Sequence, residues 1–229
     1  MIIAILSLGF SVYKIVDCFR QAYEISESTE QLYSKAFENN NGNDAGYSFD
    51  CEEVQSENPD IIAWIYSENT PINYPILQGY DNSKYLRQAV DGSYNIAGSI
   101  FLDYRNKQDF SDFISIVYGH NMKNDSMFGT LPEYISQNYY ENHKTIDIYT
   151  KERLLVADVV SGFVCDNDFV IYEMTTYNND RKAFIDMIKE HSDFTPDAEF
   201  GVEDFYVVLS TCSYEYDNAR YVLIGKLNR

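Results

Sequence analysis

The chain has 229 residues, of which 45% are hydrophobic and 16% aromatic, which is enough for one well-packed globular domain. Its 36 Asp and Glu residues outnumber its 17 Lys and Arg residues, giving a formal charge of -19 that excludes nucleic acid, a polyanion, as a partner. A solvated acidic surface that keeps the protein soluble is the expected reason for this charge, and a specific role in binding a cation or a basic partner is the alternative.

The cysteine pattern indicates neither a disulfide framework nor a metal site. The four cysteines are Cys18, Cys51, Cys165 and Cys212. They are few and scattered, and none forms a CxxC pair that would suggest zinc. Acidic pairs such as Glu52-Glu53 lack the spacing of a calcium loop, so we expect no metal and no cofactor. A disulfide between Cys51 and Cys165 stays open.

The apolar run at residues 1–16 indicates part of a membrane anchor. It is shorter than the roughly 20 residues that cross a bilayer, and no small-residue cleavage site follows it. Lys14 and Arg20 lie on its carboxyl side, which is the reverse of the positive-inside pattern for an exported domain, and a start upstream of Met1 would resolve this. The alternative is a buried amphipathic helix of the folded domain.

Residues 17–50 are predicted to form a polar helical stalk and a linker. Five apolar side chains recur there at mixed three-and-four spacing: Phe19, Ala22, Tyr23, Ile25 and Leu32. The Asn- and Gly-rich residues 39–46 form the linker by composition. Residues 51–229 then make up the globular domain.

The globular domain is predicted to be mainly β, with accessory helices. Asn58 and Pro59 suggest a helix entry, and the apolar face of Ile61, Ile62 and Trp64 predicts a short helix over residues 58–69. Strand-like runs cover 72–77, 99–104, 113–118, 145–150, 153–164, 205–211 and 220–227, and helical patterns cover 127–140 and 180–194. Many short strands with few helices favour a closed or nearly closed β-barrel.

A histidine and a cysteine each stand at the polar end of a predicted strand. In FISIVYGHNMKN the apolar alternation ends at Tyr118, Gly119 permits a tight turn, and His120 follows. In VVLSTC, Cys212 stands at the polar end of the predicted strand, at the rim of the barrel. A thiol is nucleophilic only as thiolate, so it needs a neighbouring base, and His120 is the candidate. His143 and His191 lie among polar residues and are interpreted as surface residues.

Arg220 opens the apolar run after Cys212 and supplies a third element of this candidate site. Attack on an amide carbonyl builds negative charge on oxygen, and a positioned donor there contributes roughly 3 kcal/mol to catalysis. The guanidinium suits this role because it stays charged and has a rigid fork of donors. The alternative is an exposed ion pair with the acidic turn at residues 215–217, of little energetic value.

These motifs resemble those of the class B sortases, cysteine transpeptidases on the surface of Gram-positive bacteria. The family's TLxTC motif is matched by VLSTC at 208–212, with Val208 in place of Thr, and Arg220 follows at the expected distance. YGHNM at 118–122 matches the His motif. NPDIIAWIYSENTPINYPILQ, DNSKYL, SIFLDYRN and the helix at 180–191 also match, so the resemblance runs from about residue 58 to the end.

The resemblance implies an eight-stranded sortase barrel with helices at its N-terminus and a helix before the Cys-bearing strand. It also implies an N-terminal membrane anchor, with residues 51–229 as the catalytic domain on the extracellular face. Such enzymes cut a sorting pentapeptide of a secreted protein, NPxTx-like or LPxTG-like, after Thr. They hold the acyl fragment as a thioester and pass it to an amine of peptidoglycan or of a pilin.

The resemblance also assigns roles to individual residues. Cys212 is the nucleophile, His120 the acid and base, and Arg220 the stabiliser of the oxyanion and the substrate. Five further residues are expected to line the peptide groove: Asn82, Leu86, Tyr118, Ser210 and Thr211. Ordinary loop and rim packing is the alternative for Asn82, Leu86 and Ser210, and Tyr118 is expected either to pack on the histidine or to touch substrate.

Two other functions stay open at the level of sequence. A surface-anchored binding module would use the 21 tyrosines and the acidic face for contact with a partner. A hydrolytic cysteine peptidase would release free acid in place of an amide, and the chain order of His and Cys discriminates poorly between the two chemistries.

Overall fold

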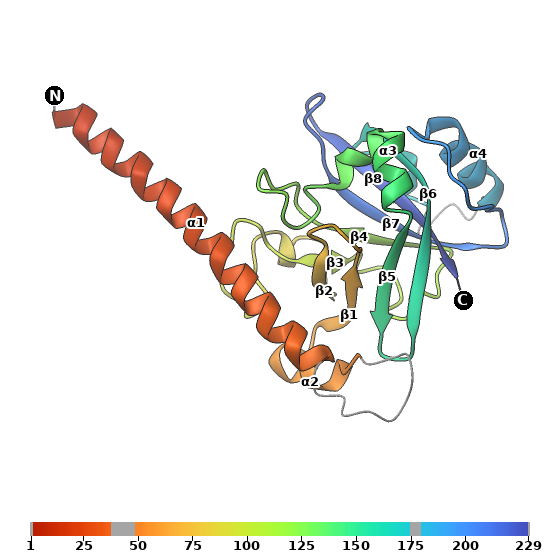
Figure 1. Cartoon of the computed structure of the whole chain (residues 1–229), viewed down its shortest axis with the longest axis horizontal. Helices are drawn as coiled ribbons and strands as arrows, with labels where there is room; N and C mark the ends of the chain where they lie inside the picture. The colour runs from red at the N-terminus through yellow and green to blue at the C-terminus, as the bar shows by residue number, and fades with distance from the viewer. Residues whose placement is uncertain (1, 38–48, 175–179, 229) are drawn as a thin grey trace.

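The computed structural model describes residues 2–37, 49–174 and 180–228, and their central feature is a closed barrel of eight strands in the order β1-β2-β3-β4-β7-β8-β6-β5. The strands are β1 (Ile61–Tyr66), β2 (Asn73–Leu77), β3 (Ile100–Leu102), β4 (Ile114–Tyr118), β5 (Thr145–Thr150), β6 (Leu154–Asp166), β7 (Phe205–Cys212) and β8 (Ala219–Asn228). Figure 1 shows the helices arranged around this barrel. The prediction of a mainly β, eight-stranded barrel is confirmed.

Two parallel pairings interrupt an otherwise antiparallel barrel. β2 pairs with β3 and β4 pairs with β7 in parallel, whereas the other six neighbouring pairs are antiparallel. The pairing of β4 with β7 joins two segments that lie far apart in sequence. It brings the segment after Tyr118 beside the end of the strand that carries Cys212.

The prediction of a helix over residues 58–69 is wrong. The helix α2 (Cys51–Glu57) lies just before this segment, and Asn58 caps its carboxyl end, with the Asn58 N–H donating to Val54 O. Residues 61–66 then form β1, and Trp64 and Ile65 are both fully buried. One face of the strand lies in the barrel core and the other packs beneath the N-terminal helices, so the run is apolar on both sides.

The helix α1 (Ile2–Phe37) runs without a break through the segments predicted as anchor and stalk. Its carboxyl end packs on the barrel through Leu32 and Ala36, in a cluster with Trp64. Toward its N-terminus it projects away from the barrel (Figure 1). No helix in the described ranges combines the length and apolar character that a bilayer crossing requires. The predicted linker at 39–46 lies outside the described residues.

The helix α4 (Arg181–His191) precedes β7, as predicted, and covers the outer face of the barrel. Its buried side chains are Phe184, Ile185, Met187 and Ile188. The helical pattern predicted over 127–140 is split into a 3-10 helix, η2 (Leu131–Ile135), and a short α-helix, α3 (Gln137–Asn142). Ser136 lies between them with extended backbone angles, which explains the break.

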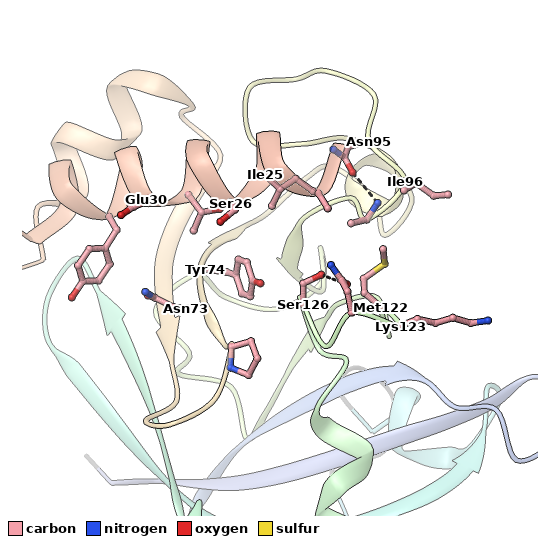
Figure 2. A pocket seen from close by; sticks show the side chains of 16 residues that line it. Ile25, Ser26, Glu30, Asn73, Tyr74, Asn95, Ile96, Met122, Lys123 and Ser126 are labelled. Carbon is pink, nitrogen blue, oxygen red and sulfur yellow. Dashed lines mark hydrogen bonds between the residues drawn. The ribbon is translucent and has the colours of Figure 1, made fainter. Parts of the chain in front are cut away.

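A groove of about 780 Å³ separates α1 from the loops of the barrel beside it. Figure 2 shows Ile25 and Ser26 of α1 facing Tyr74 and the loop that carries Met122 and Ser126. The side chains that line it are a mixture of apolar groups, amides and hydroxyls. Cys212, His120 and Arg220 line a different, smaller cleft.

Candidate active site

The β7–β8 hairpin carries Cys212 and Arg220. β7 ends at Cys212, and the antiparallel register places Arg220 directly opposite it. Residues that are directly opposed on antiparallel strands project from the same face of the sheet. A bond of 2.8 Å from Ser213 N to Ala219 O closes the connecting turn, and Asn218 has a φ of 66°, a left-handed conformation that Asn tolerates better than most residues.

His120 approaches this hairpin from the neighbouring parallel strand. β4 pairs with β7 up to Tyr118 and Ser210, and a bond of 3.1 Å from Gly119 N to Ser210 O continues the pairing by one residue. His120 therefore follows directly beside the end of β7. Its own carbonyl accepts a bond of 3.0 Å from Phe128 N, which fixes the backbone at this point.

A glycine is required at position 119 because there is no room for a side chain, and not because of its backbone angles. Its φ is not in the left-handed region, so the predicted reason for the glycine, a tight turn, is not the operative one. A Cβ at this position would lie 2.4 Å from Ile100 Cδ1 and 2.6 Å from Phe128 Cδ2. Both neighbours are buried in the barrel core, so they cannot move aside freely. The close packing under His120 therefore depends on the absent side chain.

The imidazole of His120 is held by the last residue of the 3-10 helix η1 (Lys84–Leu86). Its Nε2 lies 2.7 Å from Leu86 O. A carbonyl only accepts hydrogen bonds, so Nε2 carries the proton and Nδ1 is the free basic nitrogen of the neutral ring. Burial is the main cause that lowers the pKa of His120 below its ordinary value; the bond to Leu86 opposes this shift and nearby Arg87 adds to it. The imidazole is therefore mainly neutral at pH 7.

Asn121 joins the histidine loop to the cysteine. Its Nδ2 donates to Cys212 O at 2.8 Å, and its own carbonyl accepts from Tyr214 Oη at 3.0 Å. The end of β7 and the turn after it are thereby fastened to the residue that follows His120. Asn121 was not among the predicted site residues, although it lies inside the YGHNM segment.

The three residues His120, Cys212 and Arg220 line one cleft of about 330 Å³. All eight residues singled out from the sequence line it: Asn82, Leu86, Tyr118, His120, Ser210, Thr211, Cys212 and Arg220. Phe101, Gly119, Asn167 and Tyr172 complete the lining. The cleft is thus built from segments that are remote in sequence and brought together by the pairing of β4, β7 and β8.

Arg220 extends from the barrel rim without pairing to the acidic turn. Its Nη1 donates to the carbonyls of Asn218 at 3.3 Å and Ala219 at 3.0 Å. Within the described part of the chain, no ion pair joins it to Glu215 or Asp217. The positive charge in the cleft is therefore not neutralised by the turn beside it.

The remaining predicted residues form the walls. Ser210 Oγ lies 2.8 Å from Tyr172 Oη, in a bond that either hydroxyl can donate. Thr211 Oγ1 is buried and has no hydrogen-bond partner among the described residues. Leu86 is 41% exposed, so its side chain offers apolar surface at the cleft mouth.

Tyr118 and Asn82 meet at a buried carboxylate that the sequence analysis did not select. Tyr118 Oη donates to Asp103 Oδ2 at 3.0 Å, and Asn82 Nδ2 donates to the same oxygen at 2.8 Å. The ring of Tyr118 packs between Phe101 and Tyr172, with ring centroids 5.3 and 6.4 Å away. An acidic residue and an arginine two positions apart at the end of an apolar strand, as in SIFLDYRN, was the signal available in the sequence.

The other cysteines that the structure describes are free, so the disulfide left open between Cys51 and Cys165 is not formed. Cys165 lies opposite Arg220 on β6, and burial is the main cause that raises its pKa to about 12, which keeps it protonated at neutral pH. Burial also raises the pKa of Cys51. No group of three or more potential metal ligands occurs in the described ranges.

His143 and His191 lie outside the cleft. His191 is exposed, as interpreted from the sequence, and its Nδ1 lies 2.9 Å from Met187 O. His143 is half-buried, which differs from that interpretation, because its ring stacks on Tyr139 at 4.0 Å between centroids.

The comparisons with known proteins agree on one family. The chain is 34% identical over 183 residues to sortase B of Staphylococcus aureus (strain NCTC 8325 / PS 47), covering 77% of this chain and 73% of that protein. It is 33% identical over 181 residues to sortase B of Listeria monocytogenes serovar 1/2a, covering 78% and 74%. No family model matches the chain.

Solved structures give the same result in three dimensions. The 2.0 Å crystal structure of S. aureus sortase B has a TM-score of 0.80 at 28% identity, covering 92% of this chain and 99% of that one. An S. aureus sortase B–substrate complex has a TM-score of 0.73 at 26% identity, covering 96% and 98%. A sortase B complexed with triglycine has a TM-score of 0.75 at 29% identity, covering 92% and 97%. With its closed barrel and this level of identity over three quarters of its length, the chain belongs to the class B sortases, a family of cysteine transpeptidases.

Proposed function

We propose that this sortase cleaves a C-terminal sorting pentapeptide after Thr and transfers the acyl fragment to an amine through a thioester on Cys212. The observation that carries the proposal is the meeting of Cys212, His120 and Arg220 in one cleft. The solved complexes of sortase B with a substrate and with triglycine support a peptide donor and an amine acceptor for this chain as well.

The first half of the reaction forms the thioester. Neutral His120 takes the proton of Cys212, and the sulfur then attacks the backbone carbonyl carbon of the Thr residue. Arg220 stabilises the negative charge that develops on the carbonyl oxygen. The C–N bond then breaks, and the departing amine receives the proton from the imidazolium of His120.

The second half releases the product. An acceptor amine attacks the thioester carbon, the C–S bond breaks, and Cys212 leaves as thiolate. The proton lost by the amine passes to His120 and returns to the sulfur, so the enzyme is regenerated without change in protonation. The donor of the amine is a peptidoglycan precursor or a pilin, and the cleft walls at Asn82, Leu86, Tyr118, Ser210 and Thr211 hold the peptide.

The proposal is tested by intact-mass measurement of the full chain incubated with NPxTx-type and LPxTG-type peptides. We expect a covalent adduct equal to the acyl fragment with one of the two peptides, absent in Cys212→Ala. Addition of triglycine should discharge this adduct into an amide. If no adduct forms with either peptide, the proposal fails. Release of free acid at a rate that triglycine does not change would instead support a peptidase.

Membrane attachment through residues 1–16, with the catalytic domain of residues 51–229 outside the cell and residues 17–50 as a stalk and linker, is part of the proposal. The family is associated with the cell surface of Gram-positive bacteria, and the first residues are apolar in sequence. We expect the full chain in the membrane fraction, accessible to protease in intact cells, and expect Leu6→Arg to release it. Recovery of the unaltered chain in the soluble fraction would contradict this part.

A further inference from the structure

A fully buried carboxylate lies beneath the cleft wall. The Asp103 side chain is 0% exposed and accepts five hydrogen bonds. Arg105 gives three of them: Nε to Oδ1 at 2.8 Å, Nη2 to Oδ2 at 2.7 Å and its backbone N–H to Oδ1 at 3.0 Å. A buried charge persists only when it is paired and hydrogen-bonded in this way.

The other two donors belong to the cleft. Asn82 Nδ2 and Tyr118 Oη both donate to Oδ2, at 2.8 and 3.0 Å. Asn82 is held from its other end as well, because its Oδ1 accepts from Tyr104 N at 3.0 Å. The carboxylate therefore fixes the position of two wall residues on different segments, one after β2 and one at the end of β4.

The arginine extends the same network to two further residues of the cleft. Arg105 Nη2 also donates to Tyr172 O at 3.2 Å, in the 3-10 helix η3 (Val170–Tyr172), and the hydroxyl of Tyr172 bonds Ser210. Tyr172 and Ser210 both line the cleft. One ion pair thus connects four residues that line the cleft, namely Asn82, Tyr118, Tyr172 and Ser210, although neither Asp103 nor Arg105 lines it.

The carboxylate also fixes the orientation of the hydrogen-bonding groups of Asn82 and Tyr118. An ionised carboxylate only accepts hydrogen bonds, so Asn82 must turn its amide nitrogen toward it and Tyr118 must donate its hydroxyl proton. Hydrogen bonds from Arg105 and Asn82 outweigh the effect of burial and lower the pKa of Asp103, which keeps it ionised. Burial, followed by the charge of Asp103, raises the pKa of Tyr118, which keeps the phenol protonated.

We propose that Asp103, held by Arg105, is a positioning residue for the acyl-donor peptide: it locks Asn82 and Tyr118 so that Asn82 presents its second amide N–H to the cleft as a donor for a peptide carbonyl oxygen. This inference rests on the proposed function of the cleft. A fixed donor in the cleft wall favours peptides that place a hydrogen-bond acceptor opposite it. A ligand without an acceptor there would leave a desolvated N–H unpaired.

The test compares Asp103→Asn with wild-type full chain, using a fluorogenic NPxTx-type or LPxTG-type peptide, whichever forms the adduct. The variant keeps the side-chain volume, but its uncharged amide can donate hydrogen bonds, whereas the carboxylate only accepts them. We expect KM for the peptide to rise on the order of tenfold, the size of one charged hydrogen bond, with kcat changed less. The rate at which iodoacetamide alkylates Cys212 should stay the same, because that small reagent does not use the wall.

Asp158→Asn is the matched control. Asp158 also accepts from an asparagine, Asn228 Nδ2 at 3.0 Å, and pairs with a cation, Lys226 Nζ at 3.5 Å, but it lies on β6 away from the cleft. We expect no change in KM from it. If Asp103→Asn leaves KM unchanged, or lowers peptide turnover and alkylation in the same proportion, Asp103 has no positioning role.

A double substitution separates positioning from stability. Combining Asp103→Asn with Asn82→Asp restores a donor and an acceptor between these two positions but reverses their sense. We expect Tm to recover relative to Asp103→Asn while KM stays high. Recovery of KM together with Tm would show that only the presence of the bond matters, which overturns the proposal. If Asp103→Asn fails to fold, Arg105→Lys keeps the charge, loses the bidentate fork and should raise KM with kcat little changed.

A measurement without turnover keeps this inference distinct from the proposed function. In nitrogen-15 spectra of the free protein, the side-chain amide proton of Asn82 that is bonded to Asp103 should exchange slowly with solvent in wild type and rapidly in Asp103→Asn. Equal exchange in the two proteins overturns the positioning role. Absence of any acyl adduct in the wild type, in contrast, overturns the proposed function and leaves the exchange result as the test of the network.

Discussion

Arg220 lies directly opposite Cys212 in the β7–β8 ladder, and its guanidinium is bonded only to backbone carbonyls of its own turn among the described residues. Because no acidic partner neutralises it in that part of the chain, its charge is available to an oxyanion formed next to the sulfur. We expect Arg220→Ala to lower the acylation rate about 10²–10³-fold, as for loss of one oxyanion donor, with Tm little changed.

Arg220→Lys and Arg153→Ala complete this experiment. The lysine variant keeps the charge but loses the fork, so we expect partial activity between wild type and Arg220→Ala. Arg153 is exposed beyond the end of β5 and should be silent. Single-turnover acylation followed by intact mass measures all three. An Arg220→Ala rate equal to wild type would show that another group stabilises the oxyanion.

The pH dependence of acylation should report the depressed pKa of His120. Burial is its main cause, and the positive charge of Arg87 adds to it. His120 must be neutral to accept the thiol proton, so activity falls as pH drops through its pKa, and the acid limb of kcat/KM should lie below about 6.5, the ordinary histidine value. Removing a nearby positive charge raises the pKa, so Arg87→Ala should move this limb to higher pH. An acid limb above 6.5 in wild type would contradict the assignment.

Asn121 should contribute to acylation by fixing the end of β7. Asn121→Asp keeps the shape of the side chain but cannot donate to Cys212 O, so the bond of 2.8 Å is replaced by repulsion between two oxygens. We expect a loss of about 10-fold in the acylation rate, the size of one hydrogen bond of about 1.5 kcal/mol. Asn124→Asp lies in the same loop and its side chain bonds Ser126, away from the cysteine, so it is the control. Equal rates for the two variants would remove Asn121 from the site.

Gly119→Ala should destabilise the fold through overpacking. Its Cβ would lie 2.4 Å from Ile100 Cδ1, and insertion of a methyl group into a packed core costs about 1–3 kcal/mol. Gly201→Ala is the matched control, because nothing described lies within 4 Å of the corresponding Cβ. Urea denaturation measures both. Equal urea midpoints for the two variants would show that the barrel beneath His120 accommodates the extra methyl group without loss of stability.

The strands of the barrel were largely predictable, and β1 shows where periodicity fails. Alternation marked the run at 145–150 correctly, because only one of its faces lies in the core. The run at 205–211 was also predicted as a strand, although it is buried on both faces. The run at 61–66 is buried on both faces, and a short run that is apolar on both sides has no period that separates strand from helix. Asn58 was interpreted as a helix start, but it ends the preceding helix.

The cleft was predictable to the extent that its residues stand at strand ends in recognisable motifs. His120, Cys212 and Arg220 follow or open apolar runs that the sequence reveals. Asp103 is different, because its importance comes from being 0% exposed with donors from three segments, and sequence spacing does not report burial. The contact of Asn121 with Cys212 likewise depends on the parallel pairing of β4 with β7, a long-range partner choice that local patterns do not encode.

The central position of β7 restricts how a peptide can be recognised. The strand is paired with β4 on one side as far as Ser210 and with β8 on the other as far as Cys212. Only Thr211 and Cys212 extend beyond the pairing with β4, and the side chain of Asn121 already donates to Cys212 O. The described strands therefore leave no long free edge beside the sulfur on which an incoming chain could extend the sheet, as many peptide-binding domains allow. Selectivity between sorting signals must then reside in amides, hydroxyls and apolar groups of the cleft walls, so exchanging a few such side chains between relatives should retarget the enzyme without redesign of its barrel.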